Sequence, residues 1–229
     1  MNTLHFIAKG SNYVNRLIES KPYIGNNFNL IIHTDAPKLV EKTFKNADIR
    51  KYNEPTFRYF DKYSLTYNIT QEINEPVMYI DTGRIKSIFS TNMPYFDKST
   101  IQKLYTFSNW GGVKSAFSLR SFSSPYFEDG YWDTILDYFE QEGLNLNKIH
   151  PLLERVFIFP TDGKMSTVIE ALENVREIFE RNSREKTHVY SGIGNGEGLA
   201  LGYALTKTNT SYNLLKDVSI LTNQPYTIL

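Results

Sequence analysis

The stretch PVMYIDTGRI, residues 76–85, places four largely apolar residues directly before the polar triplet Asp81-Thr82-Gly83. A short apolar run bounded by proline and glycine predicts a buried strand. Open α/β sheets place their ligand sites at the carboxyl ends of such strands. Asp81 in that position can hold a divalent metal, a ribose hydroxyl or a catalytic water, or it only caps the following turn.

Strand and helix patterns alternate along the first half of the chain. Apolar runs bounded by polar or turn residues predict strands at residues 4–8, 29–34, 48–51 and 77–80. Segments with helical signals predict intervening helices at residues 11–20, 37–45 and 57–73. The last of these carries Leu65, Ile69 and Ile73 at intervals of four. Strands separated by helices predict an α/β fold with a mostly parallel, Rossmann-like sheet flanked by helices.

The second half is less regular. It contains a predicted helix at residues 132–141, a buried strand at 155–159 and a long helix at 165–184 that Asp162 caps. A glycine-rich turn at residues 191–198 leads into a last helix at 199–207, and the tail after it is expected to be extended and loop-like. With no Pro/Ser-rich linker or repeat, we expect one domain, with residues 1–85 as a nucleotide-binding half and 86–229 as a donor-sugar and acceptor half.

Composition narrows the class of protein. The chain has 229 residues, of which 41% are hydrophobic and 22% charged, as in ordinary globular proteins. It has no cysteine, which excludes disulfides, thiolate metal sites and cysteine catalysis and suits a cytoplasmic protein. The 25 basic residues equal the 25 acidic residues in number, so no net charge supports strong nonspecific binding of nucleic acid. We expect no membrane span, because no apolar run approaches about 18 residues.

Several segments in the first half together resemble one enzyme family, the GT-A-type nucleotide-sugar glycosyltransferases. The loop after the first predicted strand resembles the family's loop around the nucleotide base, and NLIIHTD, ending at Asp35, resembles its second strand. FDKYSLTYNI resembles the helix before the metal motif, where a basic residue, here Lys62, faces the diphosphate. VMYIDTGRI occupies the place of the Asp-X-Asp motif. The resemblance implies that the donor contacts Ala8, Gly10, Ser11, Tyr13, Asp35, Lys62, Asp81, Thr82 and Gly83.

Two segments of the second half resemble the retaining, blood-group-type members of the same class. WGGV, with Trp110, Gly111 and Gly112, resembles the segment that closes on the donor sugar, although it is equally typical of an aromatic corner with a flexible turn. NGEGLALGYAL resembles the region that carries the acceptor-side carboxylate, which makes Glu197 the implied catalytic or acceptor-orienting residue, together with Asp81 at the donor side. Glycosyl transfer requires neutralisation of the departing diphosphate and a carboxylate or oriented amide near the anomeric carbon.

The chain departs from the family at the metal motif. The second aspartate of Asp-X-Asp is the usual direct metal ligand, and this chain has Gly83 there. Either Asp81 holds a manganese or magnesium ion with waters and another residue, or the enzyme works without metal. His188 is a candidate late ligand, although a lone histidine is more often a structural hydrogen-bonding residue.

The sequence thus predicts a glycosyltransferase of the hexosyltransferase type that uses a nucleoside diphosphate donor, most commonly UDP in the families that it resembles. The sequence does not identify the acceptor, and a surface glycan and a phage-modified DNA base are the two candidates. The expected location is the cytoplasm of a bacterium or a phage-infected host. Two alternatives stay open. The missing second aspartate is compatible with a catalytically silent nucleotide-sugar or glycan binding module. Asp81-Thr82-Gly83 is also the triplet of aspartic proteases, which would require a homodimer to supply two copies.

Overall fold

The computed structural model describes residues 1–54, 60–91, 96–107, 113–121, 132–185 and 196–214. Its strands form one mixed seven-stranded sheet in the order β3-β2-β1-β4-β6-β5-β7. The strands are β1 (Asn2–Ala8), β2 (Phe28–Thr34), β3 (Asp48–Lys51), β4 (Val77–Ile80), β5 (Leu104–Phe107), β6 (Leu153–Phe159) and β7 (Tyr212–Leu214). The mostly parallel α/β sheet predicted from the sequence is confirmed, because β3, β2, β1 and β4 pair in parallel.

One strand differs from the expectation of parallel βαβ units. β6 pairs with β4 in the antiparallel direction, with Tyr79 opposite Phe157 and Ile80 opposite Val156. A buried apolar run such as that of β6 has the same pattern in either direction, so the sequence carries no signal for its orientation. The sequence predicts an extended, loop-like tail after α7, and β7 instead adds a short strand at the edge of the sheet.

The helices follow the predicted segments closely. They are α1 (Ser11–Ser20), α2 (Pro37–Thr43), α3 (Asp61–Ile73), α4 (Ile85–Thr91), α5 (Asp133–Gln141), α6 (Lys164–Glu185) and α7 (Glu197–Lys207). Asp81 is followed by a short 3₁₀ turn, η1 (Thr82–Arg84), that leads directly into α4, which the sequence did not predict. None of the helices within the described ranges has the length and apolar content needed to cross a membrane.

By contact density the chain divides into two compact units, which do not follow a single cut in the sequence. Unit 1 comprises residues 1–106, 155–162 and 213–229, and unit 2 comprises residues 107–154 and 163–212. The interruption arises because most of β6 returns to unit 1.

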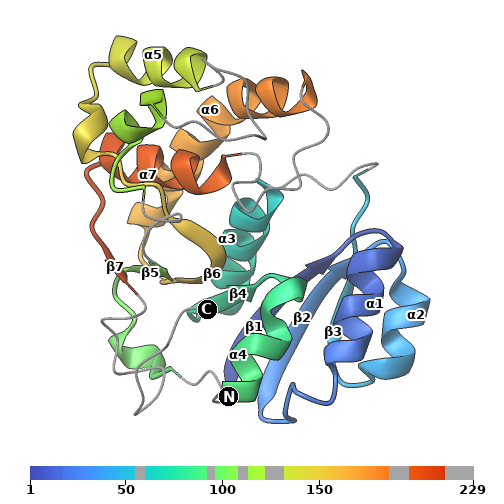
Figure 1. Ribbon diagram of the computed structural model, residues 1–229. Coiled ribbons are helices and arrows are strands. Elements are labelled where there is room, and N and C mark those ends of the chain that lie inside the picture. Colours follow the sequence, from blue (N-terminus) through green and yellow to red (C-terminus); the bar gives the residue numbers. More distant parts are fainter. Residues whose placement is uncertain (55–59, 92–95, 108–112, 122–131, 186–195, 215–229) are drawn as a thin grey trace. The chain divides into compact units, whose positions relative to one another are not determined.

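In unit 1, α3 covers one face of the parallel strands through a mixed apolar and polar stripe. Ile69 and Ile73 pack on Ile31 of β2 and Val77 of β4. Burial of such an aliphatic side chain contributes about 1.5–3 kcal/mol each. Leu65, the third residue of the predicted apolar stripe, is only half-buried. The same helix also buries polar side chains at Lys62, Thr66 and Thr70. On the ribbon, α1 lies beside α2 and α4 (Figure 1).

Candidate functional site

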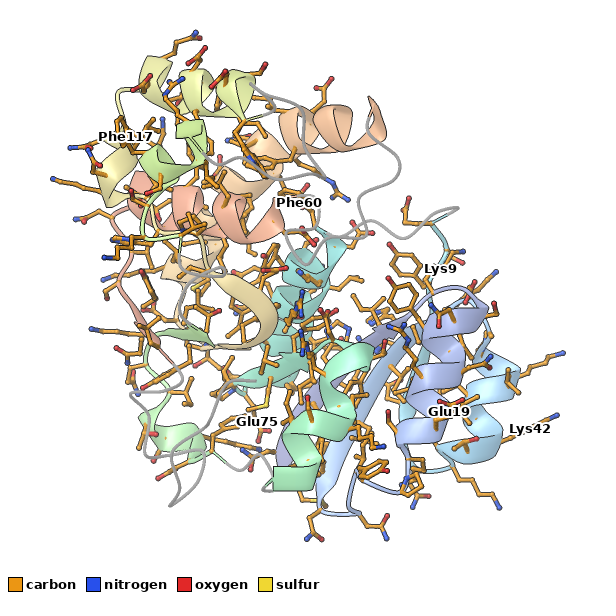
Figure 2. All side chains as sticks on the ribbon, viewed as in Figure 1. Lys9, Glu19, Lys42, Phe60, Glu75 and Phe117 are labelled. Carbon is orange, nitrogen blue, oxygen red and sulfur yellow. The ribbon has the colours of Figure 1, made fainter. Side chains whose placement is uncertain are left out.

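The strand order places a natural ligand site at the carboxyl ends of β1 and β4. The chain moves from β1 outward to β2 and β3 and then returns to the other side of β1 as β4. Ligands of open α/β sheets bind where the strand order reverses in this way, because the adjoining loops diverge there. Lys9, directly after β1, lies at this edge, and Glu75, just before β4, lies at the opposite end of the strands (Figure 2).

The loops after β1 and β2 are joined by Asp35. The backbone N–H of Gly10 lies 3.1 Å from each carboxylate oxygen of Asp35 and donates to both. Lys9 Nζ lies 3.5 Å from Asp35 Oδ2. Gly10 has a φ of 80°, which favours glycine at this turn. Asp35 therefore fixes the position of the β1–α1 loop, and Ala36, not Asp35, is the N-cap residue of α2.

Three other predicted donor contacts lie on the elements next to this loop. Ala8 is the last residue of β1 and is buried, so its contribution to a ligand site comes from its backbone. Ser11 opens α1 at an exposed position, and Tyr13 is half-buried in the first turn of that helix. The N-cap residue of α1 is Gly10, which has no side chain to accept from the N–H groups at the start of the helix.

Asp81 lies at the same edge and is held by its neighbours. The hydroxyl of Tyr79 donates to Asp81 Oδ1 at 2.7 Å, and the Asp81 backbone N–H donates to the carbonyl of Arg155 at 2.8 Å. Tyr79 and Asp81 are two residues apart at the end of a strand, so their side chains point to the same face of the sheet. Because the fold is α/β, it does not match the all-β subunit that the protease interpretation requires.

Thr82 and Gly83 differ in what they offer a ligand. Thr82 is 4% exposed, and its hydroxyl is buried without a hydrogen-bond partner in the described part of the chain. Gly83 is exposed at the surface. A side chain at Gly83 would place its Cβ 3.4 Å from Nη1 of Arg16, which reaches over from α1. The place of the second Asp-X-Asp carboxylate therefore faces a guanidinium.

The donor groups at this edge fall short of a complete metal site made of protein side chains alone. Nowhere in the described ranges do three histidine, cysteine, aspartate or glutamate side chains come together as a possible cation site. Magnesium and manganese are bound through oxygen ligands, usually carboxylates. Here Asp81 supplies the first carboxylate of the motif, and the second position carries Gly83 beside the Arg16 guanidinium.

Lys62 is buried at the beginning of α3. Its side chain is 2% exposed, and Nζ lies 5.4 Å from the centre of the Tyr63 ring, within cation–π range. The preceding residue, Asp61, accepts a hydrogen bond from the hydroxyl of Tyr52 at 2.5 Å. The predicted role of Lys62 in facing a diphosphate stays a prediction.

A buried histidine pair lies on the sheet face that α3 covers. His5 Nε2 is 2.9 Å from His33 Nδ1, and His5 Nδ1 is 2.8 Å from Thr66 Oγ1. Burial, and the positive charge of Arg50 nearby, lower the pKa of His33 to about 4. Burial and the neighbouring His33 also hold the pKa of His5 well below its ordinary value. Both rings are therefore neutral near pH 7. The rings of His5 and Tyr79 pack in a T-shaped arrangement, with their centres 5.6 Å apart.

Glu197, the predicted acceptor-side carboxylate, belongs to unit 2. It is 2% exposed and lies in the first turn of α7, where a negative charge is favourable toward the helix dipole. The glycines of its motif are explained by packing. A Cβ on Gly198 would lie 1.9 Å from the carbonyl oxygen of Leu152, and a Cβ on Gly202 would lie 2.1 Å from that of His150. α7 thus passes in close contact with the backbone of residues 150–152.

The predicted site residues fall into three groups. The first group lies in unit 1, and within it Gly10 and Asp35 are joined by a hydrogen bond. The other members of this group are Ala8, Ser11, Tyr13, Lys62, Asp81, Thr82 and Gly83. Glu197 lies in the other compact unit. The remainder lie outside the described residues: Trp110, Gly111, Gly112 and His188.

Sequence reasoning missed two features of this unit. Arg16 is one of many basic residues in predicted helices, and no spacing rule connects it to Gly83, 67 positions further along the chain. The histidine pair had a weak signal, since His5 and His33 each stand within an apolar strand run. A polar residue inside a buried run indicates a buried hydrogen-bonded group.

Comparison with known proteins gives similarity to solved structures alone. No protein-family model matches the chain, and no curated protein matches it in sequence. Among solved structures, galactosyltransferase LgtC in complex with donor and acceptor sugar analogues is similar at a TM-score of 0.41 and 11% identity, over 92% of this chain and 72% of that one. The glycosyltransferase GlyE of Streptococcus pneumoniae has a TM-score of 0.41 and 13% identity.

That similarity covers 95% of this chain but 46% of GlyE, so the chain spans about half of that protein's length. Mannose-1-phosphate geranyltransferase from Thermus thermophilus is similar at a TM-score of 0.40 and 11% identity, over 93% of this chain and 74% of that one.

Proposed function

We propose that the protein transfers a sugar from a nucleoside diphosphate donor, with UDP as the nucleotide. The observation that carries the proposal is the edge formed by β1, β2 and β4. Asp81 closes β4 there, and the Lys9–Gly10 loop is tied to Asp35 at the end of β2. Carboxyl ends of parallel strands on either side of a strand-order reversal are where α/β sheets hold nucleotides.

The roles of the side chains follow from their chemistry. Asp81 accepts hydrogen bonds from hydroxyls of the donor, since a carboxylate can accept several hydrogen bonds besides the one from Tyr79. The loop after β1 supports the base and ribose through backbone groups of Ala8 and Gly10. Glu197 acts at the acceptor side by orienting the incoming hydroxyl or stabilising charge at the anomeric carbon.

The acceptor is a glycan, with a phage-modified DNA base as the second choice. The equal numbers of basic and acidic residues favour the glycan, because DNA binding draws most of its affinity from neutralised phosphates. The second candidate function is a catalytically silent donor-binding module. Gly83 in place of the second aspartate is the observation that favours it.

Thermal unfolding with UDP, GDP and CDP tests the proposal. A ligand that binds only the native state increases the free energy of unfolding, by about 2.7 kcal/mol at a concentration of 100 times Kd, and therefore raises Tm. We expect a shift with UDP that is lost in Asp81→Asn, which removes the charge and keeps the shape. No shift with any nucleotide would overturn the proposal. A second assay measures release of UDP from UDP-sugars in the presence of glycans. A transferase releases UDP, and Glu197→Gln should slow that turnover. A silent binding module binds the donor and releases none.

A further inference from the structure

The cation that lies closest to the open position at Gly83 belongs to the protein itself. Nη1 of Arg16 is 3.4 Å from where a Gly83 Cβ would be, so any longer side chain there would meet the guanidinium. Arg16 is exposed, and its guanidinium carbon lies 5.9 Å from the centre of the Tyr13 ring. It makes no ion pair with any of the described residues. A charged fork at the surface, stacked near an aromatic ring and facing a glycine, is an arrangement that suits an anionic ligand.

Three lysines of this unit are already engaged by other side chains. Lys9 is paired with Asp35, Lys62 is buried against Tyr63, and Lys86 Nζ lies 5.5 Å from the centre of the Tyr23 ring. An arginine also offers two parallel N–H groups to a phosphate, which a lysine does not. Arg16 differs from these three lysines because it is an exposed guanidinium that lies next to Gly83.

We propose that Arg16 binds the diphosphate of the donor beside Gly83 and supplies there the positive charge that a divalent cation would otherwise supply. The inference rests on the proposed function, because it assigns a residue within the same nucleotide site. It assigns different parts of the donor to two side chains. Arg16 takes the phosphate charge, and Asp81 takes hydroxyl groups, since a carboxylate without a metal repels a phosphate. As the leaving diphosphate gains charge, the guanidinium stabilises it.

Isothermal titration in a chelator, with uridine and UDP as separate ligands, tests this division. For the wild-type chain we expect UDP to bind in the chelator, more tightly than uridine. Arg16→Gln should weaken UDP binding roughly 10- to 100-fold, as the loss of a charged hydrogen-bonding pair does, and leave uridine binding unchanged. Lys42→Gln, which removes an equal charge from the exposed last turn of α2, is the matched control and should change neither affinity.

A second variant acts on the other partner of the pair. Gly83→Asp places a carboxylate against Arg16, so it should lower UDP affinity in the chelator as Arg16→Gln does. Gly83 is exposed and its φ is not positive, so the aspartate is tolerated there.

Four results would overturn the inference while the proposed function stands. They are UDP binding that requires manganese, equal UDP affinity of Arg16→Gln and wild type, equal losses for uridine and UDP, or a loss in Arg84→Gln with none in Arg16→Gln. Failure of the wild-type chain to bind any uridine compound, with or without manganese, would instead overturn the proposed function itself.

Discussion

Gly83 and Gly198 both belong to motifs that resemble glycosyltransferase signatures, and the structure gives them opposite surroundings. Gly83 lies at the surface, and a Cβ there would meet the end of the Arg16 side chain at 3.4 Å. Gly198 lies in the interior of unit 2, and a Cβ there would lie 1.9 Å from the carbonyl oxygen of Leu152. A long side chain can move aside and a packed backbone cannot. One glycine therefore keeps a surface open, and the other permits two backbones to touch.

The largest effect is expected from Gly198→Ala. Its added methyl overlaps the Leu152 carbonyl, which should lower the free energy of unfolding by about 3 kcal/mol, the upper range for overpacking. The control is Gly163→Ala in the same unit, because nothing lies within 4 Å of a Cβ at that position. Urea unfolding followed by tryptophan fluorescence measures both. If the two variants are equally stable, the close packing of α7 is contradicted.

The second largest effect is expected from the buried pair of His5 and His33. The pKa of His33 is lowered to about 4, whereas in the unfolded chain it is about 6.5. As the pH falls from about 6.5 to about 4, His33 becomes protonated in the unfolded chain but stays neutral in the folded chain. The free energy of unfolding therefore decreases. Between pH 7.5 and 5 the loss from His33 is about 2 kcal/mol, and His5 adds to it in the same direction.

Urea unfolding at several pH values measures that loss, and His33→Gln should flatten the profile. A slope that is the same in wild type and His33→Gln would show that the histidine pair does not titrate in this way.

Tyr79→Phe sharpens the comparison at the open edge. It removes the 2.7 Å hydrogen bond to Asp81, which should lower the free energy of unfolding by about 1 kcal/mol. Because Asp81 is then held less firmly, UDP binding should weaken several-fold. Tyr52→Phe is matched to it, because that hydroxyl also donates to a carboxylate, Asp61. Titration calorimetry should show reduced UDP affinity in Tyr79→Phe and wild-type affinity in Tyr52→Phe. Equal affinities in all three proteins would remove Tyr79 from the support of the site.

The smallest effect belongs to Thr82→Val. The Thr82 hydroxyl is buried without a hydrogen-bond partner in the described ranges, so a methyl of similar size should leave stability unchanged or raise it by less than about 1 kcal/mol. UDP affinity should also be unchanged, because the hydroxyl lies beneath the surface. A marked loss of UDP affinity would show that Thr82 turns outward and contacts the donor, as the family resemblance implies.

The order of elements was readable from the sequence because local patterns determine it. The strand at Asp48–Lys51 has the predicted bounds, and α1 and α2 begin where glycine and proline signals place them. The direction of a strand and the contacts between distant side chains were not predictable from the sequence. The apolar run of β6 fits either orientation. The buried hydroxyl of Thr66 lies beside His5 of β1, a partner that only the fold supplies.

The positions of Asp81 and Gly10 in the fold were predictable for the same reason. A carboxylate at the end of a strand and a glycine in a turn are local signals in the sequence. The approach of Arg16 to Gly83 depends on how α1 packs against the turn after β4, which no local pattern encodes. The glycines after Glu197 matched a family motif, and their surroundings assign them to packing, a distinction that requires coordinates.

A crystal structure of the protein with UDP, grown in a chelator, tests the central claim most directly. The account predicts the diphosphate within hydrogen-bonding distance of the Arg16 guanidinium, above Gly83, with the ribose hydroxyls next to Asp81 and no cation between them. A diphosphate held through a metal, or a nucleotide bound away from the carboxyl ends of β1 and β4, would contradict it.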